Sequence, residues 1–153
     1  MEIQYLTKMK NNPKVGRWEI EGISEQEIIK IENEFKIKLP KAYKEFLYLG
    51  GKYTGFMQSW TTDAQYLDWS QINIRESMDN INLHLRPFFA FADFEGINCL
   101  FFFLDEGENP PIYGYDESKI YTNEKGEEVF YKKTDNSFSD CIDGFIDYAL
   151  QNG

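Results

Sequence analysis

Two pairs of acidic side chains are the residues of this sequence that could most readily do chemistry. Asp93 with Glu95, and Asp105 with Glu106, each bring two carboxyl groups close together. Such pairs supply the acid and base of a glycoside hydrolase, or the oxygen ligands of a divalent cation. The alternative is that they are solvated turn residues, which is a common place for acids. Shifted pKa values in a cleft would separate the two interpretations.

Other catalytic groups are scarce. His84 is the single histidine, so a nucleophilic triad would have to use it, and no multi-histidine metal site can be assembled. Cys99 and Cys141 are far apart, and Cys99 lies in an apolar run where a thiol packs as a small hydrophobe. A disulfide between them is possible but unusual for such a domain. We therefore predict no enzyme activity, no metal and no cofactor.

The first half of the chain predicts two short helices. Ser24 and Glu27 form a capping box that starts a helix, and Ile28, Ile31 and Phe35 give it one apolar stripe. A second helix is expected to begin at Pro40 and to bury Ala42, Tyr43, Phe46 and Leu47. We expect Gly50 and Gly51 to end it in the positive-φ conformation that glycine allows, so that Gly50-Gly51-Lys52 is a cap and not a phosphate loop.

The second half predicts an antiparallel meander followed by a helix. Residues 53–60 could form a strand, and residues 70–80 a polar helix or loop. Short aromatic or β-branched runs separated by acidic turns then indicate strands, and Ser137 caps a last helix. The expected strands cover residues 88–92, 98–104, 112–115, 119–122 and 128–132.

The net charge of −10 is concentrated in one stretch. Residues 1–92 hold 12 acidic and 12 basic side chains, whereas residues 93–128 hold 10 acidic side chains and 2 lysines. Because a negative surface repels phosphates, and no basic patch is present, direct nucleic-acid binding is excluded. The acids fall in the turns of the meander, so we expect a partner at the rim of the sheet between Asp93 and Glu128.

Aromatic side chains make up 17% of the residues, which is too rich for a disordered acidic chain. Most of them should fill the core, but Trp60 and Trp69 lie in polar surroundings and could equally form an interface. The candidate partner-binding residues are therefore Asp93, Glu95, Asp105, Glu106, Glu108, Asp116, Glu117, Trp60 and Trp69.

A chain of 153 residues is ordinary for one domain, because it can bury roughly 70% of its unfolded surface. No apolar run approaches the ~20 residues of a membrane span, and the N-terminus lacks a signal-peptide core. We expect a cytoplasmic protein that does not bind membranes.

The order of motifs resembles the SMI1/KNR4 family of the SUKH superfamily. The resemblance rests on the helix at residues 23–32, then Leu39-Pro40, Tyr43 and Phe46-Leu47, then Gly50-Gly51. Later segments follow the same order, namely residues 91–93, the apolar strand ending at Asp105, residues 111–113 and the final helix from Ser137. It implies an α+β domain with a curved antiparallel sheet and flanking helices over residues 23–153. Residues 1–22 are then expected to be an N-terminal extension packed on this domain.

The resemblance implies a binding protein without an established active site. In bacteria the family is implied to act largely as immunity proteins that neutralise secreted polymorphic toxins, many of them nucleases. A cognate basic toxin is the expected partner, since a nuclease must be basic where it holds nucleic acid. The alternative is a regulatory or scaffold module linked to cell-wall synthesis, as in fungal relatives. Pairing with a second copy of the chain stays open.

Overall fold

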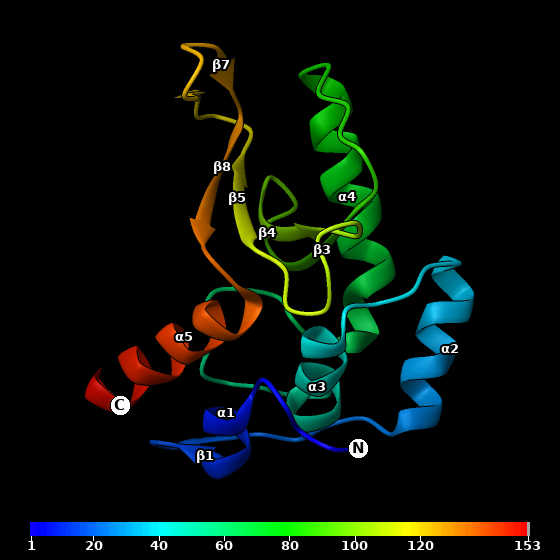
Figure 1. The fold of residues 1–153 in the computed structure, drawn as a ribbon, viewed down its shortest axis with the longest axis vertical. Coiled ribbons are helices and arrows are strands. Elements are labelled where there is room, and N and C mark those ends of the chain that lie inside the picture. The colour runs from blue at the N-terminus through cyan, green and yellow to red at the C-terminus, as the bar shows by residue number, and fades with distance from the viewer. Residues whose placement is uncertain (153) are drawn as a thin grey trace.

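A computed structural model describes residues 1–152 of the chain. A four-stranded antiparallel sheet has the order β3-β4-β5-β8. Helices α1, α2, α3 and α5 gather on one side of it, and α4 runs along β3 on the other (Figure 1). The expected α+β fold with a curved sheet and flanking helices is confirmed. Within residues 1–152, no helix is both long and apolar enough to cross a bilayer.

The sheet and a small hairpin contain most of the strands. β3 (Phe88–Phe94), β4 (Asn98–Phe103), β5 (Ile112–Asp116) and β8 (Tyr131–Asp135) form the sheet. β6 (Tyr121–Thr122) pairs only with β7 (Glu128–Val129). The predicted strand at 119–122 is therefore wrong as a member of the meander, because the chain turns out into this hairpin. The predicted strand at 128–132 is correct in part: its first two residues form β7, and its last two begin β8 of the sheet.

One of the two backbone hydrogen bonds of the predicted capping box is present at the start of α2 (Glu25–Phe35), and a contact between the two side chains stands in place of the reciprocal one. The Ser24 side chain accepts a hydrogen bond from the Glu27 backbone N–H at 3.2 Å, and it also contacts the Glu27 carboxylate. Ile28 is buried, and Ile31 and Phe35 pack against the core. Lys36 ends the helix in a left-handed conformation with φ 55°.

Helix α3 (Lys41–Gly50) follows Pro40, which lies at its N-cap. The expected positive φ at its end is wrong, because Gly51 has φ −64° and Gly50 continues the helix. Close approach explains these glycines better. A Cβ at Gly51 would lie 2.6 Å from the Leu47 carbonyl oxygen, and one at Gly50 would lie 2.7 Å from the Met9 side chain.

The segment between α3 and α4 is a loop, so the predicted strand at residues 53–60 is wrong. Two isolated β-bridges connect this loop to the rest of the fold: Tyr53 pairs with Glu21, and Thr61 pairs with Asp93. A 3₁₀ turn, η1 (Ala64–Tyr66), then leads into α4 (Leu67–Asn80). Residues 70–80 are therefore helical, which was one of the two expected alternatives.

Polar side chains of α4 fasten this helix to the edge strand β3. Gln71 uses both ends of its amide on Ala90: its Nε2 donates to the carbonyl at 2.6 Å, and its Oε1 accepts from the N–H at 3.0 Å. Arg75 donates to the Phe88 carbonyl at 2.9 Å. The register of β3 shifts between Ala90 and Ala92, and this bulge leaves backbone groups that Gln71 satisfies.

The N-terminal segment is bound to α3 by one buried carboxylate. This segment contains α1 (Thr7–Asn11), β1 (Lys14–Val15) and β2 (Trp18–Glu19). Glu45 is 0% exposed and accepts hydrogen bonds from the backbone N–H groups of Gln4, Tyr5 and Leu6 at 2.9–3.1 Å. Lys41 pairs with the same carboxylate at 3.2 Å. The division at residue 22 remains a prediction, but these contacts bind residues 4–6 to the rest of the fold.

Tyr43 lies at the centre of an aromatic core between α3, the sheet and α5 (Phe138–Asn152). Its ring is 5.4–6.1 Å from the rings of Phe46, Phe89, Phe91, Phe102 and Phe138. The Ser137 side chain caps α5 by accepting from the Asp140 N–H at 3.1 Å, as predicted. Within the described residues, the Tyr43 hydroxyl has no hydrogen-bond partner, and burial raises the pKa of this phenol.

We predict that Glu45→Gln lowers the free energy of unfolding by about 2–3 kcal/mol, because a neutral amide accepts fewer and weaker hydrogen bonds. Burial raises the pKa of Glu45, but the N–H groups of Leu6, Tyr5 and Gln4 together with Lys41 lower it more. The stabilisation is therefore complete above the unfolded pKa of about 4.3 and is lost as the pH falls through the lower folded value. Urea unfolding between about pH 7 and about pH 3 measures both effects.

Glu34→Gln is the matched control, since Glu34 is exposed and lies 4.0 Å from Lys30. It should change stability by less than about 0.5 kcal/mol. Equal losses in the two variants, or an unchanged acid sensitivity in Glu45→Gln, would contradict the role given to Glu45.

We predict that Tyr43→Phe leaves stability unchanged or raises it by up to about 1 kcal/mol, because it removes a buried hydroxyl that has no partner. Tyr115→Phe is the matched change at a satisfied hydroxyl, which lies 2.7 Å from the Ser77 hydroxyl. It should cost about 1 kcal/mol. Thermal unfolding of both variants checks the contrast, and a loss in Tyr43→Phe as large as that in Tyr115→Phe would refute it.

Candidate functional site

The acidic turns lie at two opposite ends of the sheet. Phe94 pairs with Asn98, and Asn98 pairs with Asp116, so the turns after these strands share one end. Phe88 pairs with Phe103, which puts the loop at residues 104–111 at the other end. We call these the distal end, which carries the β6–β7 hairpin, and the proximal end, where the 104–111 loop approaches α3 (Figure 1). The continuous acidic stretch of sequence is thus divided in space.

Asp105 and Glu106, at the proximal end, are both paired with Arg86. The Arg86 Nε lies 2.9 Å from Asp105 Oδ2, and its Nη2 lies 3.2 Å from Glu106 Oε1. The same guanidinium lies 3.6 Å from the centre of the Phe103 ring. Glu106 also accepts from the Tyr113 hydroxyl at 3.0 Å, and burial together with this bond raises the pKa of Tyr113 to about 12. Arg86 therefore offsets much of the negative charge predicted here.

Glu108 caps the N-terminus of α3. Its Oε2 accepts from the Lys41 N–H at 3.0 Å, and its backbone carbonyl accepts from the Ala42 N–H at 2.8 Å. Pro40, at the N-cap, provides no side-chain hydrogen bond to the helix. Glu108 thus satisfies first-turn donors that would otherwise lack partners, and the negative charge suits the helix dipole.

Asp93 is not a surface residue, so its predicted place in the partner-binding set is wrong. It is 0% exposed, because its strand pairs with Cys99 on one side and with Thr61 on the other. Its carboxylate accepts from the Ser70 hydroxyl and from the Gly96 N–H, the latter at 3.2 Å. It shapes the turn that carries Glu95.

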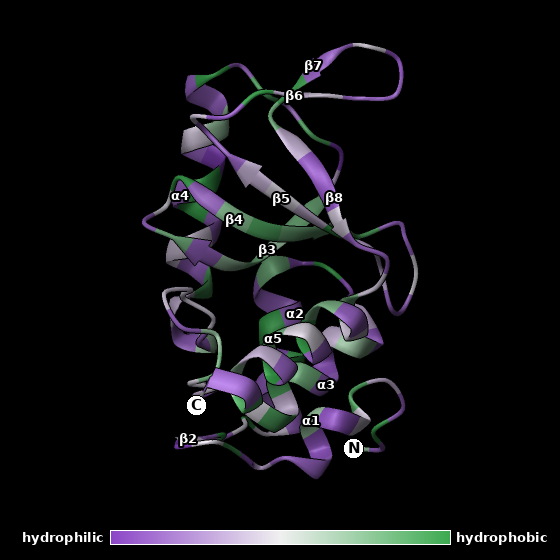
Figure 2. Cartoon of the chain, turned by 90° about the vertical axis from the view of Figure 1, so that its left-hand side faces the viewer, coloured by the Kyte–Doolittle hydropathy of each residue, from purple (hydrophilic) through white to green (hydrophobic). Residues whose placement is uncertain are grey.

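The distal end holds carboxylates with fewer internal partners. Asp116 is 19% exposed and accepts from the Ser118 N–H at 2.9 Å, with Lys119 at 4.0 Å. Glu95 is exposed and has a positive φ of 55°. Within residues 1–152, five carboxylates at this end make no ion pair, and we call them the distal acidic surface: Glu95, Glu117, Glu124, Glu127 and Glu128. The tip of the hairpin is strongly hydrophilic (Figure 2).

A groove of about 350 Å³ opens beside this surface on the α5 side of the sheet. Trp60 and Phe94 form one wall, with ring centres 6.5 Å apart, and Tyr121 forms another. Leu100 and Gly114 are neighbours across β4 and β5 and line the floor, with Asp116 and Lys119 alongside. The structure therefore joins two predicted residues, Trp60 and Asp116, in one hollow.

Trp69 is 51% exposed on α4 and does not line the groove. Sequence reasoning missed Phe94, Gly114 and Tyr121, which do line it. The sequence contains one signal for this groove. Gly114 lies between two tyrosines of a strand, and a glycine in such a position often marks the close approach of another group.

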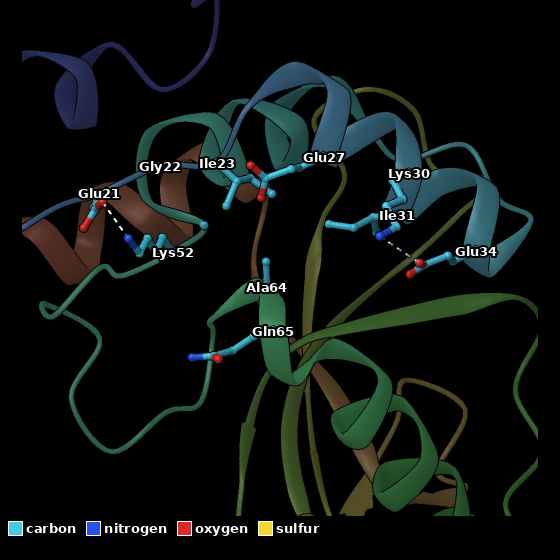
Figure 3. A pocket seen from close by; sticks show the side chains of 11 residues that line it. Glu21, Gly22, Ile23, Glu27, Lys30, Ile31, Glu34, Lys52, Ala64 and Gln65 are labelled. Carbon is cyan, nitrogen blue, oxygen red and sulfur yellow. Dashed lines mark hydrogen bonds and ion pairs between the residues drawn. The ribbon is translucent and has the colours of Figure 1, made fainter.

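A second cleft lies elsewhere, between α2 and the residues that follow α3 (Figure 3). Its volume is about 600 Å³, and Ile23, Ile31 and Ala64 form its apolar part. Four of its five charged side chains pair with each other, Lys52 with Glu21 at 2.9 Å and Lys30 with Glu34 at 4.0 Å, and the fifth is Glu27. The cleft thus has a mixed charge that favours no single ligand.

The remaining reactive groups are buried or isolated. Cys99 and Cys141 are both free, and burial raises the pKa of each thiol, which suppresses the reactive thiolate. His84 is exposed, 3.1 Å from the Asn82 side chain. Among residues 1–152, no three histidine, cysteine or acidic side chains gather as a metal-ligand group.

The sequence matches the SMI1 / KNR4 family (SUKH-1) over residues 22–144. The chain belongs to this family. SMI1/KNR4 domains are generally non-catalytic binding modules. The matched region includes the sheet, the aromatic core and both ends described above, and it begins at Gly22, just before the capping box of α2. A search of curated proteins finds no significant match.

We predict that Asp93→Asn destabilises this SMI1/KNR4 domain by about 1–3 kcal/mol, because an amide in place of the carboxylate leaves a buried donor or acceptor unpaired. Glu95→Gln, two residues away and exposed, should change stability by less than about 0.5 kcal/mol. Chemical denaturation of both variants makes the comparison. A stable Asp93→Asn variant would mean that the hydrogen bonds to Ser70 and Gly96 do not hold the turn.

Proposed function

We propose that this protein is an immunity protein that binds a cognate toxin in the cytoplasm and blocks it without catalysis. The single observation that carries the proposal is membership of a family of binding modules, over residues 22–144. The distal acidic surface supports it further. None of its five carboxylates makes an ion pair among residues 1–152, so they are available to a positively charged partner.

The partner that this charge fits best is a basic protein, such as a nuclease toxin. A nuclease needs positive charge where it holds the phosphate backbone. A negative surface raises the rate at which such a partner is captured, and it can cover the residues that the nucleic acid would contact. Inhibition then requires only that the two surfaces stay together.

The distal end is a better candidate for this contact than the proximal end. Arg86 already pairs with Asp105 and Glu106, and Glu108 caps α3, so these three carboxylates contribute to the fold. Substituting them would disturb the 104–111 loop as well as any interface. Glu95, Glu117 and the hairpin acids can be neutralised with less structural cost, because none of them makes an ion pair within residues 1–152.

The test uses a toxin domain encoded beside the gene for this protein, mixed with the purified full chain. We expect inhibition of the toxin, with an association rate that falls about tenfold between low and high salt. Glu117→Gln with Glu127→Gln should lower the low-salt rate about two- to fivefold, because it removes charge that steers the partner. Stopped-flow or biosensor kinetics provide the rates.

Glu19→Gln with Glu34→Gln is the control pair, since it removes the same charge from exposed positions on β2 and α2. It should leave the rate nearly unchanged. An association rate indifferent to ionic strength, or equal effects of the two pairs, would refute the acidic-surface mechanism. Failure to bind any neighbouring toxin, together with capture of cell-wall synthesis enzymes, would favour the regulatory alternative.

A further inference from the structure

Another groove lies where the end of α2 approaches α4 across the first residues of β3, and we call it the β3-edge groove (Figure 1). Its volume is about 290 Å³. Among the residues that line it, all within 1–152, Arg75 is the one charged side chain and Gln71 is the one other polar side chain. The most accessible part of the lining is formed by four apolar residues, Phe35, Ile37, Pro87 and Leu104. The groove is therefore an apolar hollow with a single positive charge.

The Arg75 guanidinium is held in place at this groove. Its Nη1 donates to the Gln71 Oε1 at 3.1 Å, and its Nη2 donates to the Phe88 carbonyl at 2.9 Å. The guanidinium also lies 4.4 Å from the centre of the Phe88 ring. Gln71 is fixed in turn, because both ends of its amide bind the backbone of Ala90. An arginine that is already ordered loses little entropy when it binds a ligand.

Arg75 has no partner of opposite charge. None of the ion pairs among residues 1–152 involves it, and its two hydrogen-bond acceptors are neutral. These bonds use two of the five N–H groups of a guanidinium, so donors remain for a ligand. The surrounding groups also keep water from part of the side chain, and this burial lowers the pKa of Arg75.

The charge and the lining together define the chemistry of a ligand. A neutral ligand that covered the groove would remove more water from the guanidinium and leave its charge buried without a partner, which is unfavourable. A carboxylate would balance that charge, and its two oxygens match the planar guanidinium. A phosphate dianion would leave excess negative charge against the apolar lining. The groove therefore suits one carboxylate joined to an apolar group.

The backbone of β3 favours a free small molecule over a peptide strand. A peptide that extended the sheet would need the outward-facing N–H and C=O groups of this edge. The Leu104 N–H donates to the Pro87 carbonyl at 3.0 Å, so antiparallel alternation turns the backbone groups of Phe88 and Ala90 outward. Arg75 already binds the Phe88 carbonyl, and Gln71 binds both groups of Ala90. The volume also fits a small molecule, since ligand pockets begin at roughly 300 Å³.

We propose that the β3-edge groove binds a free monocarboxylate that carries a small aromatic or branched apolar group. Arg75 binds the carboxylate, and the apolar group packs against Phe35, Ile37 and Leu104. The inference does not depend on the immunity role. The groove lies at the proximal end of β3 and shares no residue with the distal acidic surface.

The test titrates the full chain with phenylacetate and with phenylacetamide, which has a neutral amide in place of the carboxylate. ¹H–¹⁵N NMR follows the Nε–H signals of the three arginines. We expect phenylacetate to shift the Arg75 signal saturably at about millimolar affinity, and phenylacetamide to bind at least about fivefold more weakly. The signal of Arg17, which lies outside the groove, should not move. Equal affinity for the two probes, or equal shifts at Arg17 and Arg75, would overturn the proposal.

A matched pair of arginine variants locates the carboxylate. Arg75→Gln should weaken phenylacetate about five- to tenfold and change phenylacetamide little, because it removes only the charge that distinguishes the two probes. The amide signals of Phe88 and Phe89 report binding in this variant. Arg17→Gln is the control, since Arg17 also lies over an aromatic ring, 4.7 Å from the centre of Trp18. It should leave both affinities unchanged.

A second variant keeps Arg75 and changes the accessible side of the groove. Pro87→Glu introduces a carboxylate at an exposed lining position, and it should weaken phenylacetate about fivefold or more through like-charge repulsion. If Arg75→Gln unfolds, Pro87→Glu alone decides, and unchanged affinity there would refute the site. Tighter binding of an acetylated dipeptide ending in phenylalanine than of phenylacetate would overturn the assignment to a free acid.

Discussion

The burial of β4 on both faces is the constraint on which the rest of this structure depends. Cys99, Phe101 and Phe103 point to one side of the sheet, and Leu100 and Phe102 point to the other, and all five are buried. A strand without a polar face cannot stand at the surface, so helices must cover both sides. Helices α3 and α5 cover one face, and α4 covers the other. This requirement explains why the strands are rich in aromatic residues and why the acidic residues lie mainly in the turns.

The two edge strands, β3 and β8, each have backbone groups that no neighbouring strand of the sheet binds, and the two edges are protected in different ways. At β3 the side chains of Gln71 and Arg75 bind the backbone, so that α4 closes the edge as well as the face. At β8 the strand is exposed and carries Lys132 and Lys133, which discourage pairing with another strand. The Lys132 ammonium also lies 4.9 Å from the centre of the Tyr121 ring, which connects this edge to the β6–β7 hairpin.

Much of the fold could be predicted because its signals are local. The capping box at Ser24, the apolar strands and the Ser137 cap depend on residues only a few positions apart. The site could not be predicted to the same extent, because it depends on register. Two turns that are neighbours in sequence fall at opposite ends of antiparallel strands, so the acidic stretch could not remain one surface. Asp93 was misplaced because the strand was predicted to end at residue 92, whereas β3 continues to Phe94 and pairs with Thr61, which lies about 30 residues earlier in the sequence. The hydrogen bonds from residues 4–6 to Glu45 join positions about 40 residues apart, so no local sequence pattern predicts them.

The aromatic core around Tyr43 also has a consequence for how the chain is made. Tyr43 and Phe46 are produced early, whereas Phe138, which packs edge-on against both, belongs to the last helix. On the ribosome, the first three helices therefore expose an apolar face while the four sheet strands are synthesised. Such an interval exposes a nascent chain to aggregation and to binding by chaperones. We expect the yield of this small protein in cells to depend on how quickly translation delivers α5.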